Sequence, residues 1–191
     1  MGDILDDLTL EDVENAYEEK LINSGDKNIV SVVNQNNDLV YIQQLQLFCK
    51  FPKRSNTLKF SLVKFGNHER YDIRNWYDNG DKPGKGIVLT YEEIVKLRNS
   101  LRNFDFKTKF FKMCGSYTGN KVSAIIYDRI CVLNEFSSKG VKWNKEVSVV
   151  DWGYGKKIDF RKWAADYSIC GKGVAVSFAE AEEIFEIIKT L

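Results

Sequence analysis

The pattern of apolar and polar positions predicts four β-strands and one helix in the first half of the chain. Each predicted strand alternates or runs apolar and is rich in Val, Leu, Tyr or Phe. These strands span 39–50, 57–65, 68–77 and 85–89. Gly66 and Asn67, between the second and third strands, are typical of a hairpin turn. A helix is expected from Thr90, because Thr90 and Glu93 have the spacing of a capping box and apolar residues then recur at helical spacing.

The second half of the chain repeats this order of elements. Strands are predicted near 124–134, 144–152, 155–163 and 172–176. A helix follows from Ser177, where Ser177 and Glu180 again have capping-box spacing. The pattern therefore predicts an α+β protein made of two tandem units, each with a four-stranded antiparallel sheet followed by an α-helix (ββββα).

The two predicted units are also similar residue by residue. Residues 71–97 and 158–184 align without a gap at an offset of 161 − 74 = 87 positions. The identical pairs include Asp72 and Asp159, Arg74 and Arg161, Trp76 and Trp163, Gly84 and Gly171, Lys85 and Lys172, and Gly86 and Gly173. Because Trp, Arg and Gly recur in a fixed order, we interpret these stretches as two copies of one unit. The chain is then divided into an N-terminal extension (1–38), a first unit (39–101), a connecting segment (102–121) and a second unit (122–191).

Two segments outside the repeats have patterns of their own. Residues 9–22 are typical of an acidic amphipathic helix, and Ile29 to Val33 are a candidate for an additional strand. The connecting segment holds four phenylalanines, Phe104, Phe106, Phe110 and Phe111. A flexible linker is not so aromatic, so this segment is expected to pack against a unit or to add a strand.

The charge is distributed unevenly along the chain. A formal net charge of +1 conceals ten acidic and two basic residues in 1–40, against 26 basic and 17 acidic residues in 41–191. The chain therefore has an acidic extension of −8 and a basic body of +9, and a basic body favours a nucleic-acid partner. The extension has three alternative roles: competing with nucleic acid for the basic body, recruiting a protein partner through its helix, or keeping the protein in solution.

Several functional classes are disfavoured by composition. No apolar run approaches the roughly 20 residues that cross a bilayer, and the acidic start is unlike a signal peptide. We therefore expect no membrane partner and an intracellular location, in the cytoplasm or nucleoid, with the nucleus as an alternative. His68 is the one histidine, and the four cysteines include no C-x-x-C pair. We therefore expect no metal, no cofactor and no enzymatic activity, and we interpret His68 as a surface residue beside the hairpin turn.

Strand alternation places the repeated Asp-x-Arg-x-Trp residues on one face of each sheet. Asp72, Arg74 and Trp76 share that face, and the apolar positions between them belong under the helix. An antiparallel sheet covered on one side displays its second face, so each unit is expected to present aromatic rings beside an arginine. This combination suits single-stranded nucleic acid, because a stacked base gains about 1–3 kcal/mol and guanidinium groups hold phosphates. The alternative is that Trp76 and Trp163 are core residues and that Arg74 pairs with Asp72 or its neighbours as a solvated ion pair.

The same motif resembles a known family. Asp72-Ile73-Arg74-x-Trp76, followed by Lys82-Pro83-Gly84-Lys85-Gly86 and a helix, resembles the single-stranded-DNA-binding domain of the positive cofactor four transcriptional coactivators. The second copy is similar to the bacterial relatives of that family. The resemblance implies curved four-stranded sheets that pair through their helices and form channels for single strands. Here we expect the two linked units to pair as an intramolecular pseudo-dimer, as a monomer or in a higher oligomer.

The resemblance also implies which residues contact DNA. In the first unit these are Phe65, Arg74, Trp76, Lys82 and Lys85, and in the second unit Trp152, Lys156, Lys157, Arg161, Trp163 and Lys172. Two departures from the family suggest unequal surfaces: the first hairpin lacks the family's lysine, and Ile169-Cys170 replaces Lys-Pro in the second copy. The expected function is single-stranded DNA binding in transcription regulation or genome maintenance, with RNA binding or a protein-interaction module as alternatives.

Overall fold

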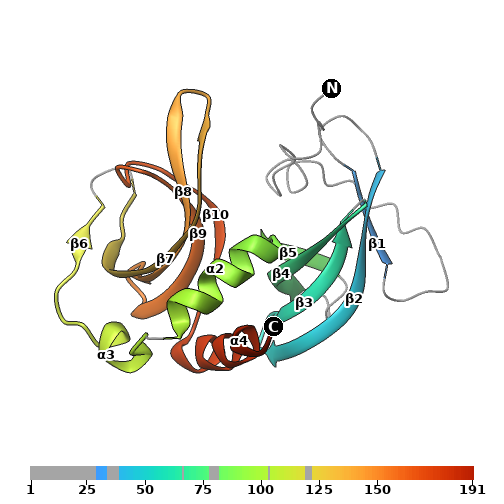
Figure 1. Cartoon of the computed structure of the whole chain (residues 1–191), viewed down its shortest axis with the longest axis horizontal. Helices are drawn as coiled ribbons and strands as arrows, with labels where there is room; N and C mark the ends of the chain where they lie inside the picture. The colour runs from blue at the N-terminus through green and yellow to red at the C-terminus, as the bar shows by residue number, and fades with distance from the viewer. Residues whose placement is uncertain (1–28, 34–38, 66, 78–81, 103, 119–121) are drawn as a thin grey trace. The chain divides into compact units, whose positions relative to one another are not determined.

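The structure, a computed structural model, describes residues 29–33, 39–65, 67–77, 82–102, 104–118 and 122–191. The helix predicted over 9–22 lies outside these residues. The chain divides into two compact units, residues 1–90 and 91–191, and each contains one curled antiparallel sheet (Figure 1). The α+β class is therefore confirmed. Within the described ranges, no helix has the length and apolar character needed to cross a membrane.

The sheet of the first unit has five strands in sequential order. They are β1 (Ile29–Val33), β2 (Leu39–Pro52), β3 (Thr57–Phe65), β4 (His68–Tyr77) and β5 (Lys82–Leu89). The predicted strand at 29–33 is present as β1 and pairs with β2, so a four-stranded sheet was an underestimate. Phe65 pairs directly with His68, so β3 and β4 follow each other in the chain as the predicted hairpin requires, and Gly66 of the predicted turn lies outside the described residues.

The second unit contains a five-stranded sheet and three helices among its described residues. The helices are α2 (Tyr91–Leu101), α3 (Phe106–Phe110) and α4 (Phe178–Thr190). The strands are β6 (Ser116–Tyr117), β7 (Ile125–Ser138), β8 (Val141–Asp151), β9 (Lys156–Ala164) and β10 (Cys170–Val176), in the order β10-β9-β8-β7-β6. The predicted capping box of α4 is confirmed, because Ser177 Oγ accepts from the Glu180 amide while the Ser177 amide donates to the Glu180 carboxylate.

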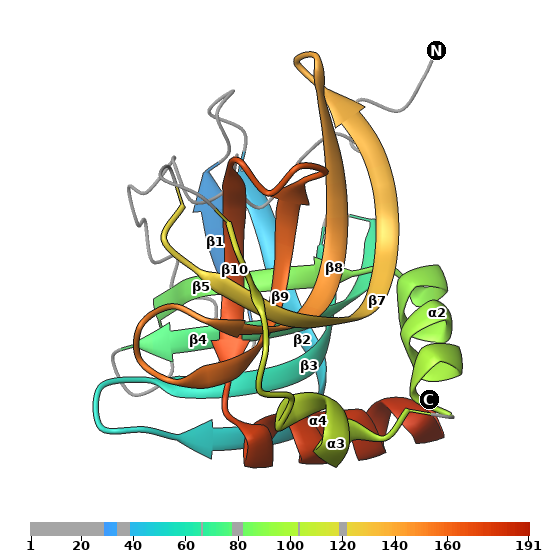
Figure 2. The same ribbon diagram turned by 90° about the vertical axis from the view of Figure 1, so that its left-hand side faces the viewer.

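Both sheets owe their curl to bulges on a long strand. Register shifts interrupt the pairing of β2 with β3 at two points and that of β7 with β8 at three points. Each bulge places an extra residue on one strand, which bends that strand and increases its twist. The result in the second unit is a strongly bent β7–β8 hairpin (Figure 2).

Helix α2 packs within the second unit, although the sequence pattern groups it with the first four strands. It contacts β7 and α4, and in Figure 2 it lies beside β7. Lys96 Nζ donates to the carbonyl of Leu133 at 3.0 Å, and Glu93 pairs with Lys145 at 2.7 Å. The compact division of the chain accordingly falls between residues 90 and 91, not after residue 101.

The described residues of the connecting segment pack against the second unit. Phe106 stacks on Phe178 of α4 with centroids 4.5 Å apart, and Phe110 meets Phe178 edge-on at 4.9 Å. Beyond α3, the short strand β6 pairs with β7. The segment therefore both packs and adds a strand, as its aromatic composition predicts, and the sheet of the second unit has five strands instead of four.

Candidate nucleic-acid interface

The repeated aspartate and arginine make the same contacts in both units. Arg74 Nε lies 3.0 Å from the Asp72 carboxylate, and its Nη1 donates to the carbonyl of Gly84 at 2.9 Å. In the second unit Arg161 Nε lies 2.9 Å from Asp159, and its Nη1 donates to the carbonyl of Gly171 at 2.9 Å. We call each set of three residues, Asp72, Arg74 and Gly84 or Asp159, Arg161 and Gly171, the Asp–Arg–Gly clamp.

The clamp spans an irregularity that both sheets share. The register shifts between Arg74 and Trp76 where β4 meets β5, and in the second unit it shifts between Cys170 and Gly173 where β10 meets β9. At this point the neighbouring backbone comes very close to Gly86 and Gly173, where an added Cβ would lie 2.7 Å from the Ile73 oxygen and 2.3 Å from the Phe160 oxygen. The arginine satisfies the glycine carbonyl at the bulge, so the motif has a structural role in both units.

The expectation that the Asp-x-Arg-x-Trp motif is displayed on an open face is wrong for five of its six residues. Asp72 is 2% exposed and Asp159 is 0% exposed. Arg74 is 1% exposed, Trp76 is 6% exposed and Trp163 is 0% exposed. In the second unit the reason is plain, because Val122, Ala124 and Ile126 pack against Trp163 at the entry to β7. Strand alternation assigns these residues to the correct face, but it does not reveal what covers that face. The alternative interpretation is confirmed in that the tryptophans are core residues and Arg74 pairs with Asp72, but it is wrong about solvation, because this ion pair is buried.

The aromatic rings of the second unit are occupied by one another. Trp152 stacks on Trp163 with centroids 5.5 Å apart and an interplanar angle of 12°, and Tyr167 meets Trp163 edge-on at 5.5 Å. Trp152 Nε1 also donates to Asp159 at 2.9 Å, and the Arg161 guanidinium lies 4.6 Å from the Trp152 centroid. Both tryptophans are thus engaged within the unit.

A buried carboxylate lies beside this cluster and was missed by sequence reasoning. Glu146 on β8 is fully buried and pairs across the sheet with Arg161 on β9. It accepts from Ser148 Oγ at 2.6 Å and from Tyr167 Oη at 3.1 Å, and it lies 3.0 Å from Arg129 Nε. We call these four residues the Glu146 network. Alternation along β8 places Glu146 on the face of Trp152, which was the available signal.

Burial dominates the titration of both carboxylates on this face. It raises the pKa of Glu146 above its ordinary value, although Ser148, Arg129 and Tyr167 act in the opposite direction. Burial also raises the pKa of Asp159, against the effect of Arg161. Desolvation favours the neutral form of an acid, so neither charge is fully compensated by its partners.

The first unit has a lysine where the second has Glu146. Lys59 pairs across the sheet with Arg74, as Glu146 does with Arg161. Its Nζ lies 4.5 Å from the centroid of Trp76. Ser61 Oγ, the counterpart of Ser148, is buried and has no hydrogen-bond partner among the described residues. The two faces therefore share a clamp and differ in the charge opposite it.

The other predicted contact residues are positioned differently in the two units. Lys82 and Lys85 are exposed on β5. Lys157 and Lys172 are half-buried, and Lys156 lies 4.0 Å above the ring of Tyr127 and donates to the Lys112 carbonyl. Phe65 ends β3, but its side chain lies outside the described part of the chain. His68, expected at the surface, is half-buried.

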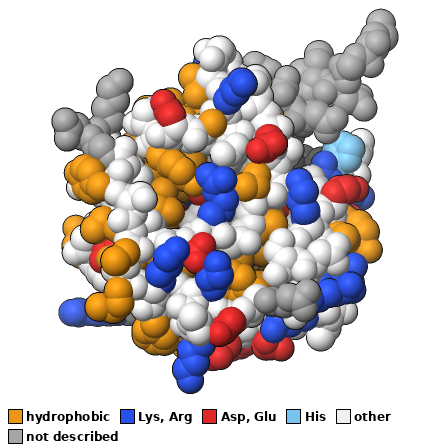
Figure 3. All heavy atoms as spheres, turned by 60° about the vertical axis from the view of Figure 1, so that its left-hand side comes forward, with side chains coloured by type: hydrophobic (Ala, Val, Ile, Leu, Met, Phe, Trp, Pro, Cys, Tyr) orange, Lys and Arg blue, Asp and Glu red, His pale blue; other side chains and the backbone are white. Residues whose placement is uncertain are grey.

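Exposed hydrophobic side chains accompany the lysines on the second unit. Tyr154, in the β8–β9 hairpin, is 91% exposed and Met113 is 88% exposed. On the face shown in Figure 3, Lys and Arg side chains are interspersed with Asp and Glu side chains and with hydrophobic and neutral atoms. Among the described residues, no group of three or more His, Cys, Asp or Glu side chains is placed to hold a metal ion.

Comparison with known proteins supports the family that the motif resembles. Residues 52–100 match the family model described as Transcriptional Coactivator p15 (PC4). A protein of Treponema pallidum (strain Nichols), named as uncharacterized, is 50% identical over 38 residues, which are 20% of this chain and 45% of that protein. The match thus spans less than half of that relative. No solved structure matches the chain significantly. The matched family consists of single-stranded-DNA-binding, coactivator-type domains that are not enzymes, which supports nucleic-acid binding by residues 52–100.

Proposed function

We propose that this protein is a non-enzymatic, intracellular single-stranded-DNA-binding protein that acts in transcription regulation or genome maintenance. The observation that carries the proposal is the family match over residues 52–100, which include Arg74, Trp76 and the exposed Lys82 and Lys85. Because Trp76 is 6% exposed and lies beneath Lys59, lysine-to-phosphate contacts supply the first binding step. Base stacking on the buried Trp76 then requires the side chains that cover its ring, Lys59 among them, to move.

We also propose that the two halves are tandem units of this family that pair as an intramolecular pseudo-dimer. Two observations support this: the Asp–Arg–Gly clamp recurs at the same offset of 171 − 84 = 87 residues, and α2, which follows the first repeat, packs against α4, which ends the second. Covalent linkage raises the effective concentration of one half for the other. Sedimentation should therefore give a monomer over about a 100-fold range of protein concentration.

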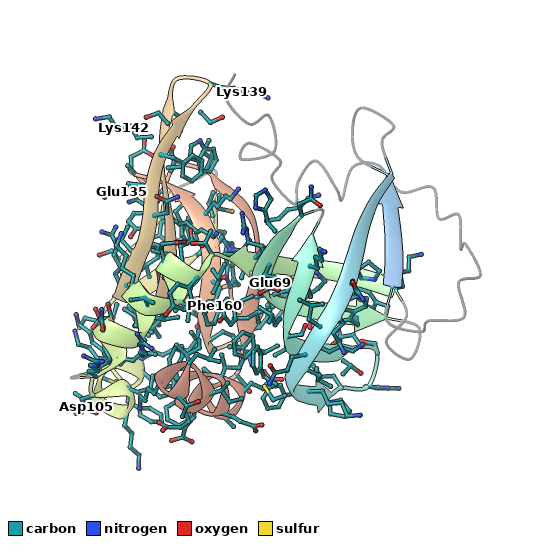
Figure 4. All side chains as sticks on the ribbon, turned by 45° about the vertical axis from the view of Figure 1, so that its right-hand side comes forward. Glu69, Asp105, Glu135, Lys139, Lys142 and Phe160 are labelled. Carbon is teal, nitrogen blue, oxygen red and sulfur yellow. The ribbon has the colours of Figure 1, made fainter. Side chains whose placement is uncertain are left out.

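Fluorescence anisotropy tests the binding function directly. The probes are a labelled DNA strand of about 20 nucleotides, the matching duplex and an RNA strand, each at about 50 mM and 200 mM salt. We expect the DNA strand to bind most tightly and to lose affinity at the higher salt. A suitable control is Lys139→Glu, because Lys139 lies in the turn of the β7–β8 hairpin, beyond its last paired residues (Figure 4).

Each contrary result has a specific meaning. If the RNA strand bound more tightly than the DNA strand, the protein would be an RNA-binding protein. If the DNA strand and the duplex bound equally well, binding would be due to electrostatic attraction to phosphates, with no preference for single strands. Absence of salt-sensitive binding to all three probes would contradict the proposal and favour the protein-interaction module.

A further inference from the structure

We infer that the two units have unequal roles, a conclusion that rests on the proposed function. The sheet face of the first unit binds the strand, and the corresponding face of the second unit is occupied by its own side chains and serves as a structural partner. We call these surfaces the motif faces, meaning the faces that carry Asp72, Arg74 and Trp76 or Asp159, Arg161 and Trp163.

The first argument is the formal charge of the two motif faces. Residues on the two central strands correspond one to one, because Lys59 pairs with Arg74 and Val63 with Arg70 in the first unit, as Glu146 pairs with Arg161 and Val150 with Lys157 in the second. In the first unit Lys59, Arg70 and Arg74 stand against Asp72, so the charge is 3 − 1 = +2. In the second unit Lys157 and Arg161 stand against Glu146 and Asp159, so the charge on these two strands is 2 − 2 = 0, and Arg129 of β7 adds one positive charge beside Glu146. A polyanion is therefore attracted more strongly to the first face than to the second.

The second argument is the use of hydrogen-bond donors. A phosphate needs donors, and the Glu146 carboxylate already receives those of Ser148, Tyr167 and Arg129. The Asp159 carboxylate receives that of Arg161, as Asp72 receives that of Arg74 in the first unit, and in addition that of Trp152. Two internal carboxylates thus take the interactions that phosphates would take. A strand entering this face would have to displace them and leave a buried charge uncompensated, which is costly.

The third argument is the state of the aromatic rings. A base gains affinity by stacking on a ring face that is open to solvent. Trp152 and Trp163 stack on each other, Tyr167 covers Trp163 from the side, and Val122, Ala124 and Ile126 pack against the same cluster. Among these residues the second motif face therefore presents no ring that lacks an internal aromatic partner. On the first face, Trp76 is buried as well, and Lys59 lies over its ring.

The residue opposite the clamp arginine has a selective role. Lys59 contributes a positive charge above Trp76, whereas the equivalent Glu146 organises an internal network. The same strand position therefore favours DNA in one unit and disfavours it in the other. One chain is then expected to bind one strand on one face.

The matched pair Lys85→Glu and Lys172→Glu tests this inference in the full-length chain. The two lysines occupy equivalent positions, 172 − 85 = 87 residues apart, near the start of β5 and β10. We expect Lys85→Glu to weaken single-strand binding about tenfold or more and to reduce the salt slope by about 0.7 for each phosphate that the variant no longer neutralises. Lys172→Glu is expected to change affinity by less than about twofold, like the Lys139→Glu control. Far-ultraviolet circular dichroism verifies that each variant is folded.

A second pair uses the position opposite the clamp. Lys59→Glu should weaken binding about tenfold, since it gives the first unit the charge of the second. Glu146→Gln keeps an acceptor for Ser148 and Tyr167, and its affinity should equal that of wild type. Equal losses for Lys85→Glu and Lys172→Glu, or a larger loss for Lys172→Glu, would overturn the inference while leaving single-strand binding intact. Failure of the wild-type chain to bind would overturn the proposed function itself.

Discussion

The two units keep one arrangement of residues and differ in another. Both retain the clamp, in which an arginine joins a buried aspartate to a glycine carbonyl at a bulge. They differ at the residue that faces this arginine from the adjacent strand, which is Lys59 in one unit and Glu146 in the other. A motif that recurs in both units can therefore reflect a requirement of folding that the units share. In our proposal, which unit binds DNA depends on the residues beside the motif that differ between the units.

The largest expected effect concerns the shared clamp. Arg161→Ala removes the partner of a fully buried carboxylate and leaves the Gly171 carbonyl without its donor. Breaking a buried ion pair costs about 3–5 kcal/mol, and the Arg74→Ala variant should lose a similar free energy of unfolding. Urea denaturation measures both, with Lys139→Ala as an exposed control.

If the clamp stabilises the fold of both units, removal of both charged residues of one clamp should cost less stability than removal of the arginine alone. The combined substitution Asp159→Asn and Arg161→Ala should be less destabilised than Arg161→Ala alone, because no buried charge then remains unpaired. If Arg74→Ala retained full stability and lost only DNA affinity, the clamp of the first unit would be a binding element and the comparison would fail.

The next largest effect concerns the close backbone approach at the bulge. Gly86→Ala and Gly173→Ala would each place a Cβ within 3 Å of a backbone oxygen. Such overpacking costs about 1–3 kcal/mol, so both variants should unfold at lower urea concentrations than wild type. Gly171→Ala is the matched control, because its nearest neighbour would be the Lys162 Cβ at 3.4 Å. A loss in one unit only would show that the two bulges are not equivalent.

A smaller effect should distinguish the two units by pH. Burial raises the pKa of Glu146, so the folded protein binds more protons than the unfolded chain just above pH of about 4.3. The free energy of unfolding should therefore fall as pH rises through this window. Glu146→Gln should flatten that dependence and preserve or increase stability at pH of about 7. Urea titrations of this variant and of the exposed control Glu186→Gln across pH provide the measurement. A strong loss of stability in Glu146→Gln at neutral pH would contradict the interpretation that burial of the Glu146 carboxylate costs more than its partners recover.

The smallest expected effect concerns the acidic extension. Residues 1–28 contain nine acidic and two basic residues, a charge of −7. If these charges compete with DNA, their removal should tighten single-strand binding a few-fold at low salt, and the difference should vanish when salt shortens the screening length to about 8 Å. Fluorescence anisotropy of the chain without residues 1–28 and of the full-length chain measures this difference in affinity. Unchanged affinity at low salt would leave recruitment of a partner or solubility as the role of the extension.

Local sequence signals predict most of the strands and helices. Alternation along 57–65 and 68–77 and the capping box at Ser177 depend on neighbouring residues alone, and all three appear in the structure. The repeat at a constant offset also identifies the clamp residues before their contacts are known. Alternation predicts on which face of a sheet a side chain lies, and it does not predict whether that face is covered.

The remaining features depend on contacts between distant parts of the chain. Burial of Trp163 requires the segment around Val122 to cross its face, and the Glu146 network requires Tyr167, 21 residues further along the chain. The edge strand β6 has only two residues, which is too short for a recognisable period. A local sequence pattern does not predict which distant segments cover a sheet face. The motif was therefore expected to be exposed.

Photo-crosslinking followed by peptide mapping tests the central claim most directly. A single DNA strand carrying photoreactive thymine analogues is bound to the full-length wild-type protein, irradiated and digested, and the crosslinked peptides are identified by mass spectrometry. The account predicts crosslinks within 57–89, on β3, β4 and β5, and few or none within 144–172. Crosslinks of equal yield in both ranges, or concentrated in 144–172, would contradict the claim that only the first unit binds the strand.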